Sequence, residues 1–394
     1  MKKIQIILCI SLLSLGCSGA HDSNSDYDND GDTTDQSAIP DCDDTTTEFM
    51  TIAPTELSTI TSITPLGNIN PPAHIFPTDH IYINTTASDQ WADTGVPVYF
   101  PGDAWITSIS STEYLGDEPW SDYSIDFKFC KEFAAYYYHV DFLTDELLDQ
   151  INFTDDNCTT SGDDTRTCFQ SFELTVEAGT TIGYVYGTYD LGVHDGRIEP
   201  LGYADPSNYY IDDEFGIDEL HAVCPLDYYT SDLKNSLMAL VDREGDPKCG
   251  EIEQDEADTL QGNWFIPGTT GYYTDGALRL ALVHDNFDPS IGVIAIGDAV
   301  GGFAAPDGYE FTHTNSGYIN RDFNEVTPDD SIYCYGPFEA WVGWAEGEGE
   351  TAFATFTVLL QLTSEDTLII EARDANSCDE GPWGFTDASA EYER

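Results

Sequence analysis

The sequence predicts a mainly β protein with two β-rich parts. Short runs of alternating apolar and polar residues recur along the chain, and Gly, Pro and Asp separate them. Because successive side chains of a strand point to opposite faces, such runs are typical of half-buried strands. The clearest runs are residues 80–83, 97–100, 123–129, 172–176, 278–284, 292–296 and 353–362.

Helical spacing of apolar residues is confined to two segments, 144–151 and 231–243. The second has an apolar stripe and is followed by Gly245, a residue type that commonly ends helices. We therefore expect the second β-rich part of the chain to be a barrel or sandwich that contains one helix.

The N-terminus predicts export. Lys2 and Lys3 precede an apolar run that is too short to span a membrane, and residues 1–16 resemble a bacterial lipoprotein signal cleaved before Cys17. Lipid on Cys17 would anchor the protein, and Ser18 favours the outer membrane or cell surface of a Gram-negative cell. An ordinary secretory signal is the alternative.

Residues 17–47 have the composition of an acidic, disordered tether. Calcium binding is the alternative for this segment, because alternating carboxylates followed by a glycine match the first half of an EF-hand-like loop. The carboxylates are Asp26, Asp28, Asp30 and Asp32.

From residue 48 onward the composition is that of folded protein. The remaining length of about 345 residues exceeds one typical core, so two domains are expected. We place them at residues 48–200 and 220–394, with a linker at 201–219 where Gly, Pro, Asn and Asp accumulate.

The charge of the chain excludes one class of partner. Asp and Glu number 73 against 13 Lys and Arg, which gives a formal net charge of −60. Nucleic acid and anionic lipid surfaces would repel such a protein. Because the acidic residues are spread along the whole chain, surface solvation in a saline habitat explains them better than calcium binding does.

Cysteine usage agrees with export. Of the 10 cysteines, Cys9 lies in the signal and Cys17 is the lipidation site, which leaves 10 − 2 = 8. An even number in an exported chain predicts disulfides. Cysteines near one another in sequence suggest three pairs: Cys158 with Cys168, Cys224 with Cys249, and Cys334 with Cys378.

Histidines in the first part predict a metal site. Four of the eight histidines stand in or beside β-type runs between Pro71 and Asp195, namely His74, His80, His139 and His194. Zinc sites commonly combine two or three histidines with a carboxylate, taken from strands distant in sequence.

The order of motifs around these histidines supports a family resemblance over residues 66–198. The motifs are, in order, PPAHIFPTDHIYI, VPVYFPGDAWITSI, SDYSIDFKF, AAYYYHVDFL and ELTVEAGTTIGYVYGTYDLGVHD. This order resembles the lysostaphin-type zinc endopeptidases, which implies a duplicated hybrid β-fold of sandwich or barrel type. It also implies one zinc held by two histidines and an aspartate.

The resemblance carries over to particular residues. His194 matches the metal-binding second histidine of the family's "H.H" strand, and His139 matches the catalytic histidine of its "Y.Hl" strand. Gly192 stands where the family has the first histidine of "H.H", so one proton-handling imidazole is missing.

The expected metal ligands are therefore His80 and His194, completed by His74, Asp79 or Asp195. In a regular strand, Asp79 and His80 would point to opposite faces and would not both reach one ion. The family's spacing between His and Asp is also not kept, because His74 precedes Asp79 by five residues.

Aromatic residues suggest a different function class. They make up 13% of the chain and could stack on sugar rings or peptidoglycan, although large aromatics mostly fill cores. The tryptophans concerned are Trp91, Trp105, Trp120, Trp341, Trp344 and Trp383. In the second part, His284 stands at a strand end, where a core or edge position is the favoured interpretation.

Three functions remain open at this stage. The first is a degenerate peptidase-like module that binds peptidoglycan, a surface glycan or a partner protein. The second is an active zinc-dependent peptidoglycan endopeptidase. The third is a calcium-binding surface adhesion protein.

Overall fold

The computed structural model describes residues 38–87, 95–115, 120–161, 165–209, 211–212, 217–269, 279–297, 301–303, 307–341, 356–375, 377–379 and 382–394. Residues 38–394 form one compact unit, and its fold is mainly β, as the sequence predicts. The signal segment, Cys17 and the four aspartates of the calcium alternative, Asp26, Asp28, Asp30 and Asp32, lie outside the described residues, as do Trp91 and Trp344.

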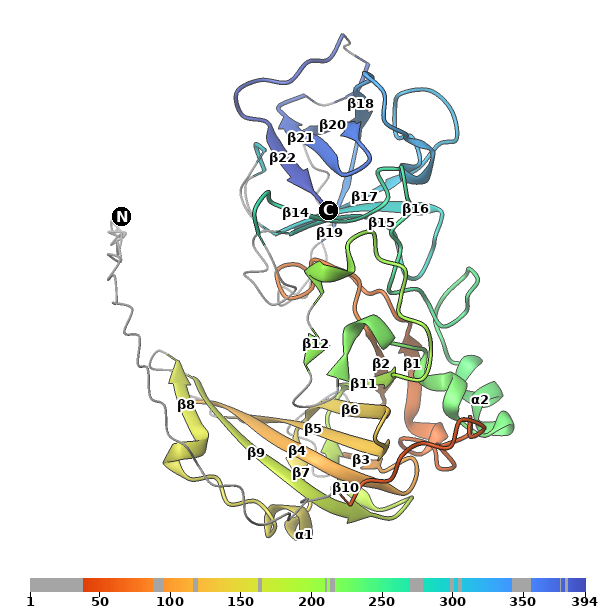
Figure 1. Cartoon of the computed structure of the whole chain (residues 1–394), viewed down its shortest axis with the longest axis vertical. Helices are drawn as coiled ribbons and strands as arrows, with labels where there is room; N and C mark the ends of the chain where they lie inside the picture. The colour runs from red at the N-terminus through yellow and green to blue at the C-terminus, as the bar shows by residue number, and fades with distance from the viewer. Residues whose placement is uncertain are drawn as a thin grey trace, which may run out of the picture. The chain divides into compact units, whose positions relative to one another are not determined.

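The first half contains an antiparallel sheet of eight strands in the order β1-β2-β11-β6-β5-β4-β9-β8. Figure 1 shows β4, β5, β6 and β9 side by side in this sheet. The strands are β1 (Ile60–Thr64), β2 (His80–Thr85), β4 (Ala104–Tyr114), β5 (Trp120–Cys130), β6 (Phe133–Val140), β8 (Cys158–Ser161), β9 (Thr165–Val176) and β11 (Thr188–Asp195).

A three-stranded sheet packs on the same core. It consists of β3 (Val96–Tyr99), β10 (Thr181–Val185) and β7 (Phe142–Leu143). Its apolar residues, such as Val98 and Ile182, share a cluster with Ile109, Tyr137 and Leu191 of the large sheet. One face of the large sheet is thereby covered, which leaves the opposite face for polar side chains.

The second half is a nine-stranded antiparallel sheet in the order β18-β20-β21-β22-β14-β15-β16-β17-β19, which forms a nearly closed barrel. Its core is aromatic and aliphatic and includes Trp264, Phe311 and Leu360. The strands are β14 (Gly262–Phe265), β15 (Arg279–His284), β16 (Ile291–Ile296), β17 (Asp307–Thr312), β18 (Tyr333–Tyr335), β19 (Glu339–Trp341), β20 (Thr357–Ser364), β21 (Thr367–Arg373) and β22 (Ala390–Glu393). A short ladder joins β12 (Ile211–Asp212) to β13 (Ile217–Asp218).

Both predicted helices are present but shorter than expected. They are α1 (Asp145–Leu148) and α2 (Ser231–Met238). The chain leaves α2 early because Ile63 on β1 takes its backbone partners from Leu240 and Asp242. Short 3-10 helices occur at Leu57–Thr59, Asp155–Asn157, Pro206–Asn208, Glu219–His221, Pro225–Tyr228 and Phe323–Glu325.

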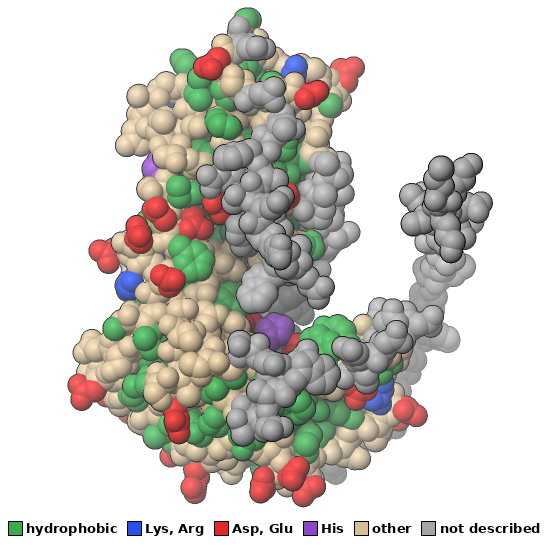
Figure 2. All heavy atoms as spheres, turned by 180° about the vertical axis from the view of Figure 1, so that it is seen from behind, with side chains coloured by type: hydrophobic (Ala, Val, Ile, Leu, Met, Phe, Trp, Pro, Cys, Tyr) green, Lys and Arg blue, Asp and Glu red, His purple; other side chains and the backbone are tan. Residues whose placement is uncertain are grey.

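The segment after the expected linker packs with the first half. Leu226, Leu237, Val241 and Ile252 all belong to the core of the large sheet, although the sequence places them in the second part. Within the described residues, no helix is long and apolar enough to cross a membrane. Figure 2 shows acidic side chains distributed over the visible face, with few Lys or Arg among them.

Four disulfides hold the described chain together. The structure contains all three pairs suggested by the sequence, Cys158–Cys168, Cys224–Cys249 and Cys334–Cys378. The fourth, Cys42–Cys130, closes a loop of 88 residues and attaches Cys42, near the end of the predicted tether, to β5, so this end of the tether is held against the sheet. Cross-links over long loops restrict the unfolded chain most.

One carboxyl in the segment after Cys249 makes stability depend on pH. Burial and the neighbouring Asp255 carboxylate raise the pKa of Glu253 to about 7. The folded protein therefore binds a proton that the unfolded chain releases near pH 4.3, so stability falls as pH rises from about 4.5 to 7.

We expect Glu253→Gln to raise the free energy of unfolding at pH 8 by about 1 kcal/mol, a figure reduced because the side chain is only half-buried. The gain should vanish near pH 4.5. Urea unfolding between pH 4.5 and 8 measures this, with the exposed Glu365→Gln as control. Parallel stability curves for Glu253→Gln and wild type would contradict the prediction.

Candidate functional site

The polar face of the large sheet gathers the predicted histidines. On β11, Leu191 and Val193 point into the core, so Asp190, Gly192 and His194 point to the opposite face. Gly192 pairs with His80 on β2 and with Tyr136 on β6. The strand register therefore brings His80 and His194 to one face, beside a tyrosine.

Asp79 is the hub of this cluster. Its Oδ1 lies 2.9 Å from His80 Nδ1 and accepts a hydrogen bond of 2.8 Å from the Tyr136 hydroxyl. Its Oδ2 lies 2.9 Å from His194 Nε2. The expectation that Asp79 and His80 point apart is wrong, because β2 begins at His80 and strand alternation does not apply to Asp79.

Tyr136 occupies the space that a side chain at position 192 would need. A Cβ built on Gly192 would overlap the ring and hydroxyl of Tyr136. The tyrosine hydroxyl also lies 3.1 Å from His80 Nδ1. The position of the missing family histidine is thus filled by a phenol that contacts two of the predicted site residues.

A β-bulge brings His139 to the same face. Tyr137 and Val140 both lie in the core, so the two residues between them, Tyr138 and His139, both face the polar side. His139 has a left-handed backbone with φ of 64°, and the register of β5 and β6 shifts at this point. Bulges commonly re-aim side chains at functional sites.

His139 lies between two aspartates. Its Nδ1 is 2.7 Å from Asp122 Oδ2, and its Nε2 is 3.5 Å from Asp190 Oδ2. The hydrogen bond with Asp122 and the charge of Asp190 raise the pKa of His139 to about 9. His139 is therefore a cation at neutral pH, paired with these carboxylates, and is not suited to act as a general base.

The pKa values of other titratable groups on this face are shifted in other ways. Burial, with a smaller effect of His80, lowers the pKa of His74 to about 4, so its imidazole is neutral. Burial raises the pKa of Asp126, which accepts a hydrogen bond from Ser108, to about 6. Burial also raises the pKa of Asp190, opposed by His80 and His139.

These groups line a cavity of about 310 Å³. Two deeply buried atoms of its lining residues, His80 Nε2 and Asp190 Oδ1, have no hydrogen-bond partner in the protein, although His80 Nε2 lies 3.5 Å from the other oxygen of Asp190. Such atoms are costly unless a ligand or water satisfies them. The lining residues are Ala73, His74, Ile75, Phe76, Thr78, Asp79, His80, Tyr136, Tyr138, His139, Asp190, Glu219 and Arg279.

The loop that carries His74 and Asp79 is supported from the second half. Ile75 and Phe76 pack in a cluster with Phe265 and Val283 of the nine-stranded sheet. The Arg279 guanidinium lies over the Phe76 ring at 5.2 Å. Packing of this loop therefore holds two candidate site residues in place.

Not all predicted ligands join the cluster. His74 lines the cavity, with its ring centroid 5.5 Å from that of His80. Asp195 does not join, because strand alternation turns it away from His194. It pairs with Arg197 at 2.8 Å and accepts a hydrogen bond of 2.8 Å from Tyr228.

The zinc implied by the resemblance needs donor atoms close enough to share one ion. Zinc bonds are about 2.0–2.2 Å long. In the described part of the chain, three donor atoms within 4.8 Å of one another occur at His284, His313 and Asp322, and at Cys42, Cys130 and Glu132. The groups around Asp79 do not meet this condition, so the residues as placed do not fit a three-ligand zinc site. Zinc there stays a prediction.

Comparisons with known proteins add nothing to these observations. No family model matches the chain, and neither a curated protein nor a solved structure is significantly similar to it. The resemblance to the lysostaphin-type peptidases therefore rests on the motif order alone.

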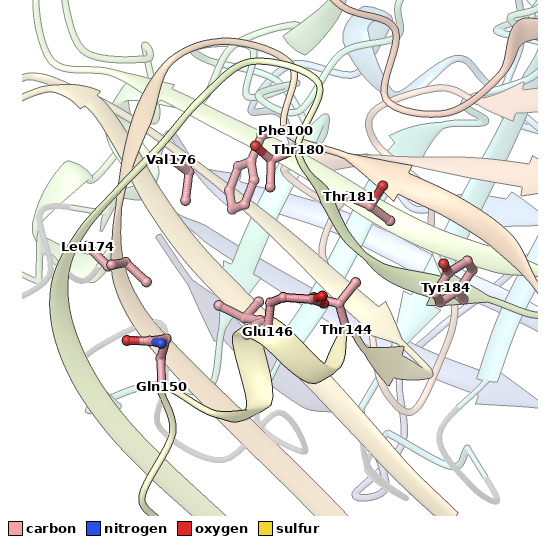
Figure 3. Close-up of a pocket in the computed structure, with 10 residues that line it drawn as sticks. Phe100, Thr144, Glu146, Gln150, Leu174, Val176, Thr180, Thr181 and Tyr184 are labelled. Atoms are coloured by element: carbon pink, nitrogen blue, oxygen red, sulfur yellow. The ribbon is translucent and has the colours of Figure 1, made fainter.

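A second cavity, of about 450 Å³, lies beside α1 (Figure 3). It contains no histidine, and Glu146 is its one carboxylate. Its lining combines aliphatic side chains such as Leu174 and Val176 with threonines. This composition is suited to binding more than to catalysis.

Aromatic exposure supports one of the suggested stacking residues. Trp120 is 46% exposed and stacks on Tyr114, with ring centroids 4.0 Å apart. Trp105 and Trp383 are half-buried. The pair at the β4–β5 hairpin therefore offers an accessible aromatic surface.

Proposed function

We propose that the His80–Asp79–His194 face is a binding site for a polar cell-envelope ligand, a peptidoglycan peptide or glycan, on an exported lipoprotein. The observation that carries this proposal is the pair of buried atoms without hydrogen-bond partners, His80 Nε2 and Asp190 Oδ1, on two residues that line the cavity. Amino or hydroxyl groups of a ligand can satisfy Asp190.

The rim of the cavity supports the same ligand class. Asp122 and Asp190, which flank the protonated imidazole of His139, attract an ammonium group. Peptidoglycan peptides carry amino groups. The volume of about 310 Å³ is at the small end of typical ligand sites, so it suits a short segment of such a polymer.

Hydrolysis is the second candidate function. His194, which matches a metal-binding position of the resembled family, has its Nε2 2.9 Å from Asp79 Oδ2, and His139 lines the same cavity. Burial and nearby carboxylates keep the pKa of Tyr136 well above its ordinary value, so its phenol stays neutral and can donate hydrogen bonds. These observations favour retained hydrolysis. The glycine at position 192, where the resembled family has a histidine, argues against it.

Sedimentation of the mature protein with purified peptidoglycan tests the first function. Asp190→Asn and His139→Ala are expected to weaken binding at least about tenfold, because each removes a charged contact worth about 1.5–3 kcal/mol. The matched control is Asp227→Asn, an exposed aspartate outside the site. Thermal unfolding verifies that the variants fold. Absence of binding by wild type, or equal binding by all variants, would contradict the proposal.

A parallel assay separates binding from hydrolysis. The products of crosslinked peptidoglycan are analysed by mass spectrometry with and without a chelator. Release of peptides that stops with the chelator and in His139→Ala would establish the second function. Binding of peptidoglycan without release of peptides would support the first function alone.

A further inference from the structure

A second group of histidines lies in the nine-stranded sheet. His284 is the last residue of β15, His313 follows β17, and Asp322 precedes the 3-10 helix Phe323–Glu325. The backbone positions are secured by hydrogen bonds. His284 N–H donates to Gln254 Oε1 at 2.8 Å, and Asp322 N–H donates to the Thr314 carbonyl at 2.9 Å.

The three side chains converge on one point. Asp322 Oδ1 lies 2.8 Å from His284 Nε2, and Asp322 Oδ2 lies 3.1 Å from His313 Nδ1. All three donor atoms lie within 4.8 Å of one another. The side chains are 18%, 17% and 9% exposed for His284, His313 and Asp322, so the group is shielded yet reachable from solvent.

The orientation of His313 shows which of its nitrogens is free. Its Nε2 lies 3.3 Å from the Pro289 carbonyl oxygen, which can only accept, so Nε2 carries the hydrogen. In neutral His313 the lone pair is then on Nδ1, which lies 3.1 Å from a carboxylate oxygen of Asp322. Two acceptors that face each other need a proton or a metal cation between them.

This arrangement is typical of metal ligands. Metal-binding histidines commonly donate their other N–H to a backbone carbonyl or carboxylate, which holds the ring and its lone pair toward the ion. Two imidazoles and one carboxylate form a donor set that zinc and related divalent ions prefer. The acidic chain, with a formal charge of −60, favours cation binding further.

We propose that His284, His313 and Asp322 bind a divalent transition-metal ion of the zinc class. Three protein ligands leave a coordination position for water or an outside ligand, in contrast to the four protein ligands of a closed structural site. The site is separate from the cavity on the first sheet and does not depend on the function proposed there.

Zinc titration of the chelator-treated mature protein tests this, with a chromophoric zinc indicator as competitor and metal analysis for stoichiometry. We expect wild type to bind zinc at this site and His284→Ala or His313→Ala to weaken it at least about 100-fold. Loss of a contact that orients a metal ligand lowers metal affinity about 10–100-fold. Loss of a ligand itself should therefore lower the affinity at least as much. His194→Ala, in the first sheet, is the matched control and should retain this zinc.

Cobalt binding gives an independent readout. Cobalt added to wild type should produce the visible absorption of a low-symmetry site with nitrogen and oxygen ligands, and Asp322→Asn should change that spectrum. Thermal unfolding of each variant shows whether it folds. Failure of wild type to bind zinc and cobalt, or unchanged affinity in both His284→Ala and His313→Ala, would overturn the proposal. Loss of all zinc in His194→Ala alone would overturn it as well.

Discussion

Gly192→Ala is expected to lower the free energy of unfolding by about 3 kcal/mol or more. A methyl group at this position would overlap the Tyr136 ring, which is packed on the glycine between β11 and β6. Overpacking in a buried site costs about 1–3 kcal/mol and sometimes more. Urea unfolding of the mature protein measures the effect.

A second substitution tests the cause. If the overlap with Tyr136 is responsible, the double variant Tyr136→Ala/Gly192→Ala should lose less unfolding free energy than the sum of the losses in the two single variants. Gly384→Ala is the matched control, because nothing lies near its added methyl group. Equal stability of Gly192→Ala and Gly384→Ala would contradict the packing described here.

Asp79→Ala is expected to lower the free energy of unfolding by about 2 kcal/mol and to weaken ligand binding at least about tenfold. The substitution leaves His80 Nδ1 and His194 Nε2 without their shared carboxylate. Removing one partner of a fully buried pair costs about 3–5 kcal/mol. The lower figure applies because the Asp79 side chain is 24% exposed.

The control for this prediction is Asp41→Ala. Asp41 also forms an ion pair, with Lys131 at 2.6 Å, but its side chain is 79% exposed. Its removal should therefore cost less than about 1 kcal/mol. Urea unfolding and peptidoglycan sedimentation are measured for both variants. If Asp79→Ala loses no more unfolding free energy and no more peptidoglycan binding than Asp41→Ala, Asp79 does not hold the two histidines as described.

The sequence predicted part of the candidate site. His194 and Gly192 are two residues apart, so strand alternation alone places them on one face. Asp190 has the same spacing from Gly192, and this signal could have identified it. Tyr136 could not be singled out among neighbouring tyrosines, because its contact with Asp79 depends on the pairing of β6 with β11.

Other parts of the site depend on irregular backbone. His139 reaches the polar face because of a bulge with positive φ, and a non-glycine residue carries no sequence signal for that conformation. Asp79 reaches His80 because the strand begins one residue later. The group of His284, His313 and Asp322 joins the end of β15, the residue after β17 and the residue before a 3-10 helix, which are separated in sequence.

The sequence by itself determined the mainly β character, the approximate places of both helices and three neighbouring cysteine pairs, because alternation, helical spacing and proximity are local properties. Tertiary structure decided which histidines meet. It gathered His80, His139 and His194 around Asp79 and Asp190, turned Asp195 toward Arg197, and brought a second histidine pair to Asp322. Contacts between distant segments follow from strand register and loop packing, which no local pattern specifies.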